Sequence, residues 1–220
     1  MDDPREVPAY PLAEAAHYLK VPHQTLQNWV YGRPDFKSVI AVPVPNVPLL
    51  SFINLVEVHV LSSIRRKHKV SLQRVRKALD YLEKEMGTIH PLATVQLETD
   101  DADLFFRELG KIINLTRGGQ IAMKETVEAY LKRIDRGFDG SPMILYPFVT
   151  NDIFTDRKPV MFNPRISFGR LVITDTGIPT FEIASRYKAG ESIRDLATDY
   201  ERDHLEIEDA IRCELQLEAA

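Results

Sequence analysis

The residues best suited to recognise another molecule lie between positions 23 and 33. They carry imidazole, amide, hydroxyl and guanidinium groups: His23, Gln24, Thr25, Gln27, Asn28, Tyr31 and Arg33. Amides and hydroxyls of this kind can read the edges of base pairs in the major groove of double-stranded DNA. The polar surface of a plain helical hairpin would have a similar composition, so this stretch alone leaves both interpretations open.

A second group of candidate residues is cationic. Positions 65–77 contain seven lysines and arginines and no acid: Arg65, Arg66, Lys67, Lys69, Arg74, Arg76 and Lys77. Charge runs are usually solvated helix faces, but contacts to DNA phosphates need such a cluster because each neutralised phosphate releases counterions. The run follows a helix-turn-helix pattern, which favours the DNA interpretation. We assign phosphate contacts to Arg65, Arg66, Lys67 and Lys69.

The polar residues need a scaffold, and the pattern from Tyr10 to Arg33 predicts a helix-turn-helix. The first helix has apolar residues at helical spacing, namely Leu12, Ala15, Ala16 and Leu19. Pro22 disfavours helical geometry at the residue before it and so ends the first helix. The second helix turns Leu26, Trp29 and Val30 inward, which leaves the polar residues on its other face.

The segment after the helix-turn-helix is rich in valine and proline. Proline cannot donate to a sheet ladder, so 38–50 is predicted to be an edge hairpin or an extended loop, where a winged helix has its wing. Ser51 is a plausible cap for a helix that runs to about Lys67, and Ser71 for a helix that ends near Glu85.

The middle of the chain gives weaker patterns. Alternation and turn residues predict strands at 94–98, 104–106 and 112–115, an amphipathic helix at 120–134, a turn-rich connection at 136–142 and a strand at 143–148.

The C-terminal part is predicted to be helical and acidic. Short strands precede three helical segments, at 181–187, 192–200 and 206–217, and Ser192 with Asp195 forms a capping box. From Glu191 onward there are ten acids and three arginines. Phosphates would repel so acidic a last helix, so we assign this end to contact with protein.

The order of elements from about Tyr10 to Glu85 resembles the DNA-binding domain of the MerR regulators. The resemblance is carried by the unit from Leu12 to Trp29, the proline-rich wing, the run from Val56 to Leu61 and the run from Lys69 to Gln73. It implies that the second helix enters the major groove while the wing and the basic turn hold the backbone. The long dimerising helix and the effector cysteines of that family are missing, so its dimer contact and effector mechanism do not carry over.

The C-terminal sequence resembles a small homeodomain-like domain of unknown function that is common in bacterial antitoxins. The matching residues are the runs 163–166, 168–173, 176–180 and 189–193, followed by Leu196, Ala197 and Tyr200. The whole chain is similar to the VapB-type antitoxins, which share this two-part plan. The resemblance implies a type II toxin–antitoxin protein that binds its operator, forms a homodimer and neutralises a PIN-domain ribonuclease toxin.

Two arginines are candidates for the implied toxin contact. Arg165 and Arg170 could pair with the acidic metal-binding pocket of such a toxin, because guanidinium groups pair well with carboxylates. The alternative is that Arg165 only braces a turn between strands. A stand-alone transcription regulator or a protein adaptor without a toxin remains the alternative function for the whole chain.

Composition excludes several other classes. With 220 residues and a net charge of −4, we expect a cytoplasmic protein without signal peptide or membrane span. Cys213 is the single cysteine and the six histidines show no ligand spacing, so no disulfide framework, metal site or cofactor is predicted. Asp175-Thr176-Gly177 matches an aspartic-protease triplet, but we interpret it as a turn in which Gly177 supplies a special backbone angle. We therefore expect no enzyme.

The predicted fold class is mainly α, of the α+β type. A winged helix-turn-helix DNA-binding domain (1–87) is followed by a mixed strand and helix segment (88–158) and by a three-helix domain preceded by short strands, homeodomain-like and antitoxin-associated (159–220).

Overall fold

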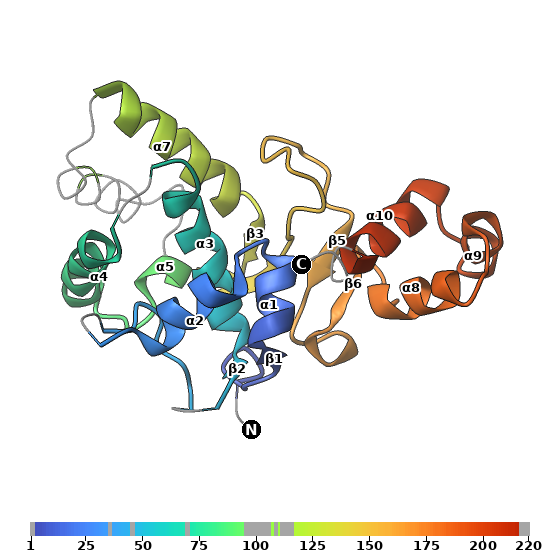
Figure 1. The fold of residues 1–220 in the computed structure, drawn as a ribbon, viewed down its shortest axis with the longest axis horizontal. Helices are drawn as coiled ribbons and strands as arrows, with labels where there is room; N and C mark the ends of the chain where they lie inside the picture. The colour runs from blue at the N-terminus through green and yellow to red at the C-terminus, as the bar shows by residue number, and fades with distance from the viewer. Residues whose placement is uncertain are drawn as a thin grey trace. The chain divides into compact units, whose positions relative to one another are not determined.

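The computed structural model describes residues 3–34, 37–44, 47–68, 71–94, 107, 110 and 117–215. The chain divides into two compact units, Met1–Met143 and Ile144–Ala220. The prediction of three segments, with boundaries at 87 and 158, stays a prediction. Helices dominate both units and the sheets are small and antiparallel, which confirms the predicted fold class (Figure 1).

The first unit contains most of the helices. Its elements are β1 (Tyr10–Pro11), α1 (Leu12–Tyr18), α2 (His23–Tyr31), β2 (Leu49–Leu50), α3 (Phe52–His68), α4 (Leu72–Met86), α5 (Pro91–Thr94), α7 (Arg117–Leu131) and β3 (Ile134–Arg136). The boundary between the units falls within β4 (Pro142–Leu145).

Helices α1 and α2 form the predicted helix-turn-helix. Helix α1 ends because Lys20 takes a left-handed backbone conformation (φ 53°) and Pro22 follows it. The amide of Val21 donates to the carbonyl of Ala16 across the turn. All the residues predicted to face inward, from Leu12 to Leu19 and at Leu26, Trp29 and Val30, are buried.

Helix α3 is the central element of the first unit, and α5 and α7 pack on it (Figure 1). Its N-terminus is capped as predicted. The amide of Asn54 donates to Ser51 Oγ, and Asn54 Oδ1 accepts from the amide of Ser51 (both 3.2 Å). This reciprocal pair satisfies amides that the first turn of a helix leaves without partners.

The valine- and proline-rich segment is an extended loop over its described residues, 37–44 and 47–48. The amides of Val39 and Ile40 donate to the carbonyl of Trp29, so the loop caps the end of α2. At its far end, Leu49 and Leu50 pair antiparallel with Pro11 and Tyr10. The hairpin that the sequence left as an alternative does not form in this part.

Some local details of the first unit differ from the predictions. The hydroxyl of Ser71 precedes α4 but caps no amide among the described residues of that helix. Helix α7 ends at Leu131, so Ile134, predicted to be helical, lies in β3. Ile121, near the start of the predicted amphipathic helix, is 55% exposed.

The strands predicted at 104–106 and 112–115 lie outside the described residues. So does the strand at 94–98 except for Thr94, which ends α5.

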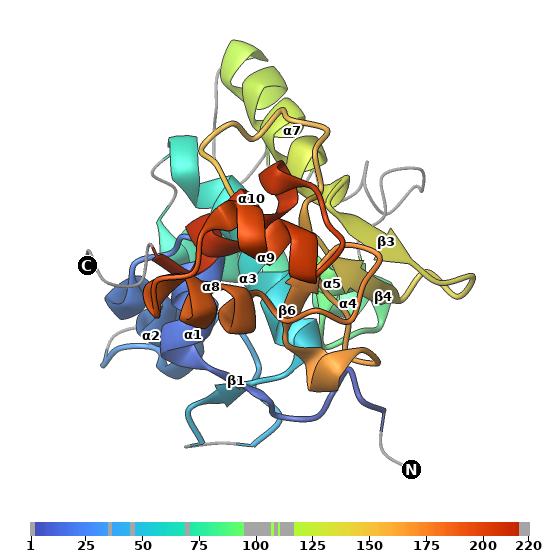
Figure 2. The same cartoon turned by 90° about the vertical axis from the view of Figure 1, so that its right-hand side faces the viewer.

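The second unit has a small sheet and three helices. The elements are β5 (Val160–Phe162), the 3₁₀ turn η1 (Ser167–Gly169), β6 (Leu171–Ile173), α8 (Thr180–Lys188), α9 (Ile193–Asp199) and α10 (His204–Leu215). Strands β5 and β6 pair antiparallel, with Val160 opposite Ile173. Figure 2 shows the three helices gathered together, and one apolar core joins them to β6.

The Asp175-Thr176-Gly177 triplet is a turn, as predicted, but the special backbone angle belongs to another residue. Asp175 is left-handed (φ 59°), whereas Gly177 is not among the residues with positive φ. The hydroxyl of Thr176 donates to the carbonyl of Ile173 and closes the turn. Aspartate is one of the few residues that tolerate this conformation.

No helix among the described residues is long and apolar enough to span a membrane.

Candidate nucleic-acid interface

Helix α2 presents a polar face to solvent. His23, Gln24 and Tyr31 are exposed, and Gln27 and Asn28 are half-buried on the same side. The opposite side of the helix is fixed by Leu26, Trp29 and Val30, which are 0–4% exposed. A helix anchored in this way on one face can offer its other face to a groove without rearranging.

Arg33 and Thr25, the remaining residues of this segment predicted to contact DNA, lie in different surroundings. Gly32 ends the helix in a conformation with positive φ (75°), and its amide donates to the carbonyl of Asn28. Arg33 follows this turn and is exposed, so it lies next to the polar face. Thr25 lies on the flank that faces α3 and is half-buried, which sets it apart from the other predicted base-reading residues.

The cationic run is not uniformly available to phosphate. Arg74 and Lys77 are exposed on α4, whereas Arg65 is half-buried at the C-terminal part of α3. Burial lowers the pKa of the Arg65 guanidinium. The side chains of Arg66 and Lys67, and the whole of Lys69, lie outside the described residues.

The prediction that no acid neutralises this run is wrong for Arg76. Its Nε lies 2.8 Å from Asp80 Oδ1, and its Nη2 lies 3.7 Å from Glu83 Oε1. Both acids follow position 77, but helical spacing of about one or two turns returns them to the face of Arg76. The predicted run ended at Lys77, three residues before Asp80, and so left out the helix turn that supplies the counter-charge.

Arg76 also holds the loop that caps α2. Its Nη1 donates to the carbonyl of Ser38 (3.0 Å), immediately before Val39 and Ile40. Arg76 is therefore a positioning residue for the candidate interface. No sequence pattern indicates this role, because the contact joins residues 38 positions apart.

A buried polar cluster supports the same loop from the other side. Asn54 Nδ2 donates to the carbonyl of Ala41 (2.8 Å) and to Glu57 Oε2 (3.0 Å). Glu57 is 3% exposed, and His90 Nδ1 lies 3.1 Å from its Oε2. Sequence inspection overlooked this cluster, since Glu57 and His90 come together only when α3 and α5 pack.

The acid and the base in this cluster shift each other's ionisation. Burial raises the pKa of the Glu57 carboxyl, against the opposing effect of His90. Burial also works against protonation of His90, but the hydrogen bond and charge of Glu57 outweigh it and raise the pKa of the imidazole.

In the second unit, Arg165 and Arg170 flank the turn η1. Arg165 is exposed, and its backbone amide donates to Asn163 Oδ1 (3.0 Å). The guanidinium of Arg170 lies over the ring of Phe181, 4.8 Å from the centroid. Between them, Phe168 is 97% exposed.

The backbone at Phe168 is held in an unusual conformation. Ser167, Phe168 and Gly169 have φ values of 47°, 57° and 79°, and the Ser167 hydroxyl donates to the carbonyl of Gly177 (2.8 Å). A large apolar side chain in a left-handed conformation is a backbone outlier of a kind that clusters at functional sites. Sequence inspection did not single out Phe168.

The acids of the last helix are not a continuous free surface. Asp209 and Glu214 are 1% and 6% exposed; Asp209 pairs with Arg157 and Arg212, and Glu214 accepts a hydrogen bond from Thr180. Elsewhere in the unit, Arg186 pairs with Glu191 and Asp199, and Arg202 pairs with Glu206. The prediction counted only three arginines against the acidic end and is incomplete, because Arg157 and Arg186 lie outside the counted segment and also pair with its acids.

Within the described parts of both units, no group of three or more His, Cys, Asp or Glu side chains is arranged to hold a metal ion.

Known protein families match both ends of the chain. Residues 8–79 match a family model described as "Putative DNA-binding HTH domain", and residues 160–213 match "Protein of unknown function (DUF433)". A Mycobacterium tuberculosis protein named "Putative antitoxin VapB45" is 32% identical over 220 residues, with 89% of each chain covered. The chain belongs to the VapB-type antitoxin family.

Two further similar proteins also match this chain over most of its length. A crystal structure of Rv2018 from M. tuberculosis superposes with a TM-score of 0.74 at 31% identity and covers 93% of this chain and 98% of that one. The "Uncharacterized protein Rv2308" of the same organism is 25% identical over 94% of this chain and 89% of its own length. The similarity to this VapB-type family thus spans both units, not only the helix-turn-helix.

Proposed function

We propose that this chain is the DNA-binding antitoxin of a type II toxin–antitoxin system, which represses its own operator and neutralises a PIN-domain ribonuclease toxin. Membership of the VapB-type family and the match to a DNA-binding helix-turn-helix support an antitoxin that binds DNA and is not an enzyme. The observation that carries the proposal furthest is the polar, anchored face of α2.

The DNA contact is assigned to the first unit. Gln24, Gln27 and Asn28 have the amide groups that pair with adenine in the major groove, and they share the solvent side of α2. His23, Tyr31 and Arg33 extend this side. Phosphate contacts are assigned to Arg65, Arg66, Lys67 and Lys69, to which the structure adds the exposed Arg74 and Lys77.

The toxin contact is assigned to the second unit. Arg165 and Arg170 supply guanidinium groups for a carboxylate-lined toxin pocket, and Phe168 adds an exposed aromatic anchor between them. We expect the antitoxin to act in the cytoplasm as a homodimer on a palindromic operator, since two-fold operators mirror two-fold proteins.

Co-purification tests the toxin assignment. The full chain is tagged and co-expressed with the product of the neighbouring gene, and we expect a stable complex that suppresses the partner's ribonuclease activity. If the neighbouring product neither co-purifies nor is inhibited, while operator binding is intact, the chain is a stand-alone regulator.

A further inference from the structure

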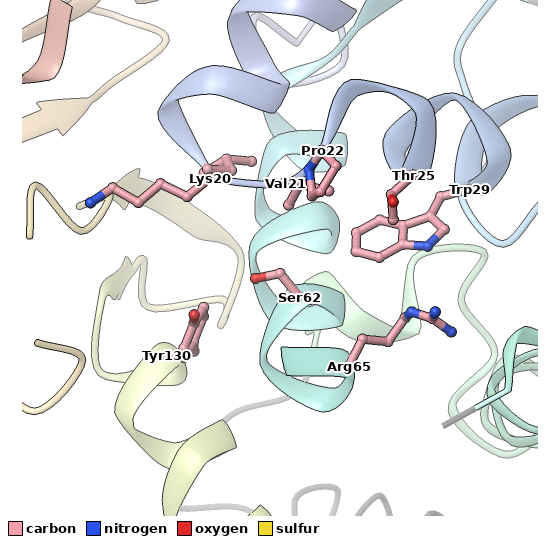
Figure 3. Close-up of a pocket in the computed structure, with 9 residues that line it drawn as sticks. Lys20, Val21, Pro22, Thr25, Trp29, Ser62, Arg65 and Tyr130 are labelled. Carbon is pink, nitrogen blue, oxygen red and sulfur yellow. The ribbon is translucent and has the colours of Figure 1, made fainter. Parts of the chain in front are cut away.

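A pocket of about 230 Å³ lies in the first unit, behind the polar face of α2. Figure 3 shows Lys20 from the α1–α2 turn, Thr25 and Trp29 from α2, Ser62 and Arg65 from α3, and Tyr130 from α7. Apolar residues of the α1–α2 turn complete its lining. Thr25 and Arg65 are also among the residues predicted to contact DNA. The other residues that line the pocket take no part in the proposed DNA contact.

The indole of Trp29 gives the first sign of a ligand. The side chain is 2% exposed, and its Nε1 has no hydrogen-bond acceptor among the described residues. Buried donors are normally paired, because a donor without an acceptor loses its hydration and gains nothing in return. In Figure 3 the nitrogen-bearing edge of the indole faces the side of the pocket where Arg65 lies.

The described polar residues of the lining are rich in hydrogen-bond donors. Lys20, Arg65 and the indole can only donate, and no Asp or Glu is among the described residues that line the pocket. Ser62 Oγ already donates to the carbonyl of His59 (2.7 Å), so its lone pairs remain to accept. Such a lining suits a ligand that carries an anionic acceptor group.

A contact between α3 and α7 supports the wall of the pocket formed by Tyr130. His59 Nε2 lies 3.0 Å from the carbonyl of Tyr130, and the two rings are 4.7 Å apart. Burial lowers the pKa of His59 to about 3, so the imidazole is neutral and donates to that carbonyl. The hydrogen bond fixes the end of α7 on α3 and keeps the Tyr130 side of the pocket in place.

We propose that this pocket binds a small organic acid, whose carboxylate accepts hydrogen bonds from Trp29 Nε1 and Arg65 while its apolar body lies against Tyr130 and the α1–α2 turn. A dry cavity of about 150 Å³ is enough to hold benzene. A benzene-sized ring with one carboxylate therefore fits the volume available. Because Thr25 and Trp29 belong to α2, the ligand braces the helix that carries the polar face.

The experiment uses the intrinsic fluorescence of the chain, because Trp29 is its single tryptophan. The full chain is titrated with benzoate, with neutral benzyl alcohol and with inorganic phosphate at constant ionic strength. We expect a saturable fluorescence change with benzoate, with a dissociation constant on the order of 1 mM for so small a ligand. Benzyl alcohol and phosphate should each bind at least about tenfold more weakly, because each lacks one half of the recognised chemistry.

Two variants place the binding in this pocket. Ser62→Leu fills the space and should abolish the benzoate response, while circular dichroism verifies that the fold is kept. Arg65→Gln should weaken benzoate binding by about tenfold or more, as loss of a charged hydrogen bond does. Arg74→Gln makes the same charge change on exposed α4 and should leave the titration as in wild type.

Three results would overturn the inference. One is the absence of a saturable response to benzoate in wild type together with no rise in its melting temperature. Another is phosphate binding as tightly as benzoate, which would mark an anion site without an organic ligand. The third is an unchanged benzoate titration in a folded Ser62→Leu variant. None of them depends on whether the chain binds DNA or a toxin.

Discussion

Glu57 and His90 show how single residues in this fold couple buried charge to stability. The carboxyl is almost completely buried, and its counter-charge is a histidine 3.1 Å away. The same carboxyl accepts a hydrogen bond from Asn54, whose side-chain amide also donates to the carbonyl of Ala41 in the loop beside α2. Ionisation of one pair is therefore linked to a segment that supports the candidate DNA-binding helix.

The first prediction concerns pH. The pKa of His90 is raised in the folded state, and so is that of Glu57, so the folded state binds protons more readily than the unfolded chain. The stabilisation is complete below about 6.5, the pKa of a free histidine, and is lost as pH rises through the folded pKa of His90. The free energy of unfolding should fall by at most about 1.4 kcal/mol per pH unit above 6.5 from this group.

Urea denaturation between pH 6 and 9 measures the effect. His90→Gln should flatten this dependence, while the same change at His204, an exposed histidine on α10, should not. An identical slope in wild type and His90→Gln would refute the assignment to this pair.

A second residue-scale prediction concerns the turn between β5 and β6. Replacing Arg165, Phe168 and Arg170 together by alanine should weaken toxin binding by about tenfold or more, since exposed aromatic and arginine side chains dominate interfaces. Operator affinity should stay within about twofold, because the proposed DNA contact uses residues of the first unit and these three residues belong to the second. Calorimetry with the purified toxin and anisotropy with operator DNA measure the two affinities. Equal toxin affinity in both proteins would remove this turn from the contact.

At the scale of elements, α10 is a packing helix more than an acidic docking surface. Ile207, Ala210 and Ile211 enter the core, and Asp209 is buried with them against Arg157 and Arg212. Its acids divide into a buried set, Asp209 and Glu214, and a half-buried set, Glu206 and Glu208. Removing a buried acid should therefore lower the free energy of unfolding more than removing a half-buried one.

Paired substitutions on α10 test this division. Asp209→Ala leaves Arg157 and Arg212 without their buried partner and should cost about 1–3 kcal/mol of unfolding free energy, reduced from a fully buried pair because Arg157 is half exposed. Glu208→Ala, next to it and only half-buried, should cost no more than about 0.5 kcal/mol. Thermal or chemical denaturation gives both values. Equal losses would mean that α10 does not pack as described.

The polar and cationic elements of the first unit should affect DNA binding in different ways. Gln24→Ala and Asn28→Ala should relax sequence preference at single base positions by about 1–3 kcal/mol. Arg74→Ala and Lys77→Ala should weaken binding to all sequences and lower the salt slope by about one each. Asn151→Ala, exposed in the second unit, is the matched control for Asn28→Ala. A change in base preference from the α4 variants would contradict this division of roles.

At the scale of the whole molecule, local patterns predicted well and long-range pairs did not. The helix-turn-helix, the Ser51 cap and the three C-terminal helices depend on neighbouring residues, and each was predicted within a few positions. The Arg76–Ser38 and Arg157–Asp209 contacts join residues 38 and 52 positions apart, so no local pattern contains them. The Arg157–Asp209 contact corrected the prediction for the acidic end. The pairs of Arg76 with Asp80 and Glu83, which corrected the prediction for the basic run, lie within α4, beyond the last residue of that run.

Operator binding by the full chain tests the central claim most directly. Fluorescence anisotropy compares a duplex from upstream of its own gene with a shuffled duplex of equal length and composition, over a series of salt concentrations. We predict binding at least about 10³-fold tighter to the upstream duplex at physiological salt, with a difference that Gln24→Ala with Asn28→Ala removes. Equal affinity for the two duplexes, or a preference that survives the double substitution, would contradict the role assigned to the polar face of α2.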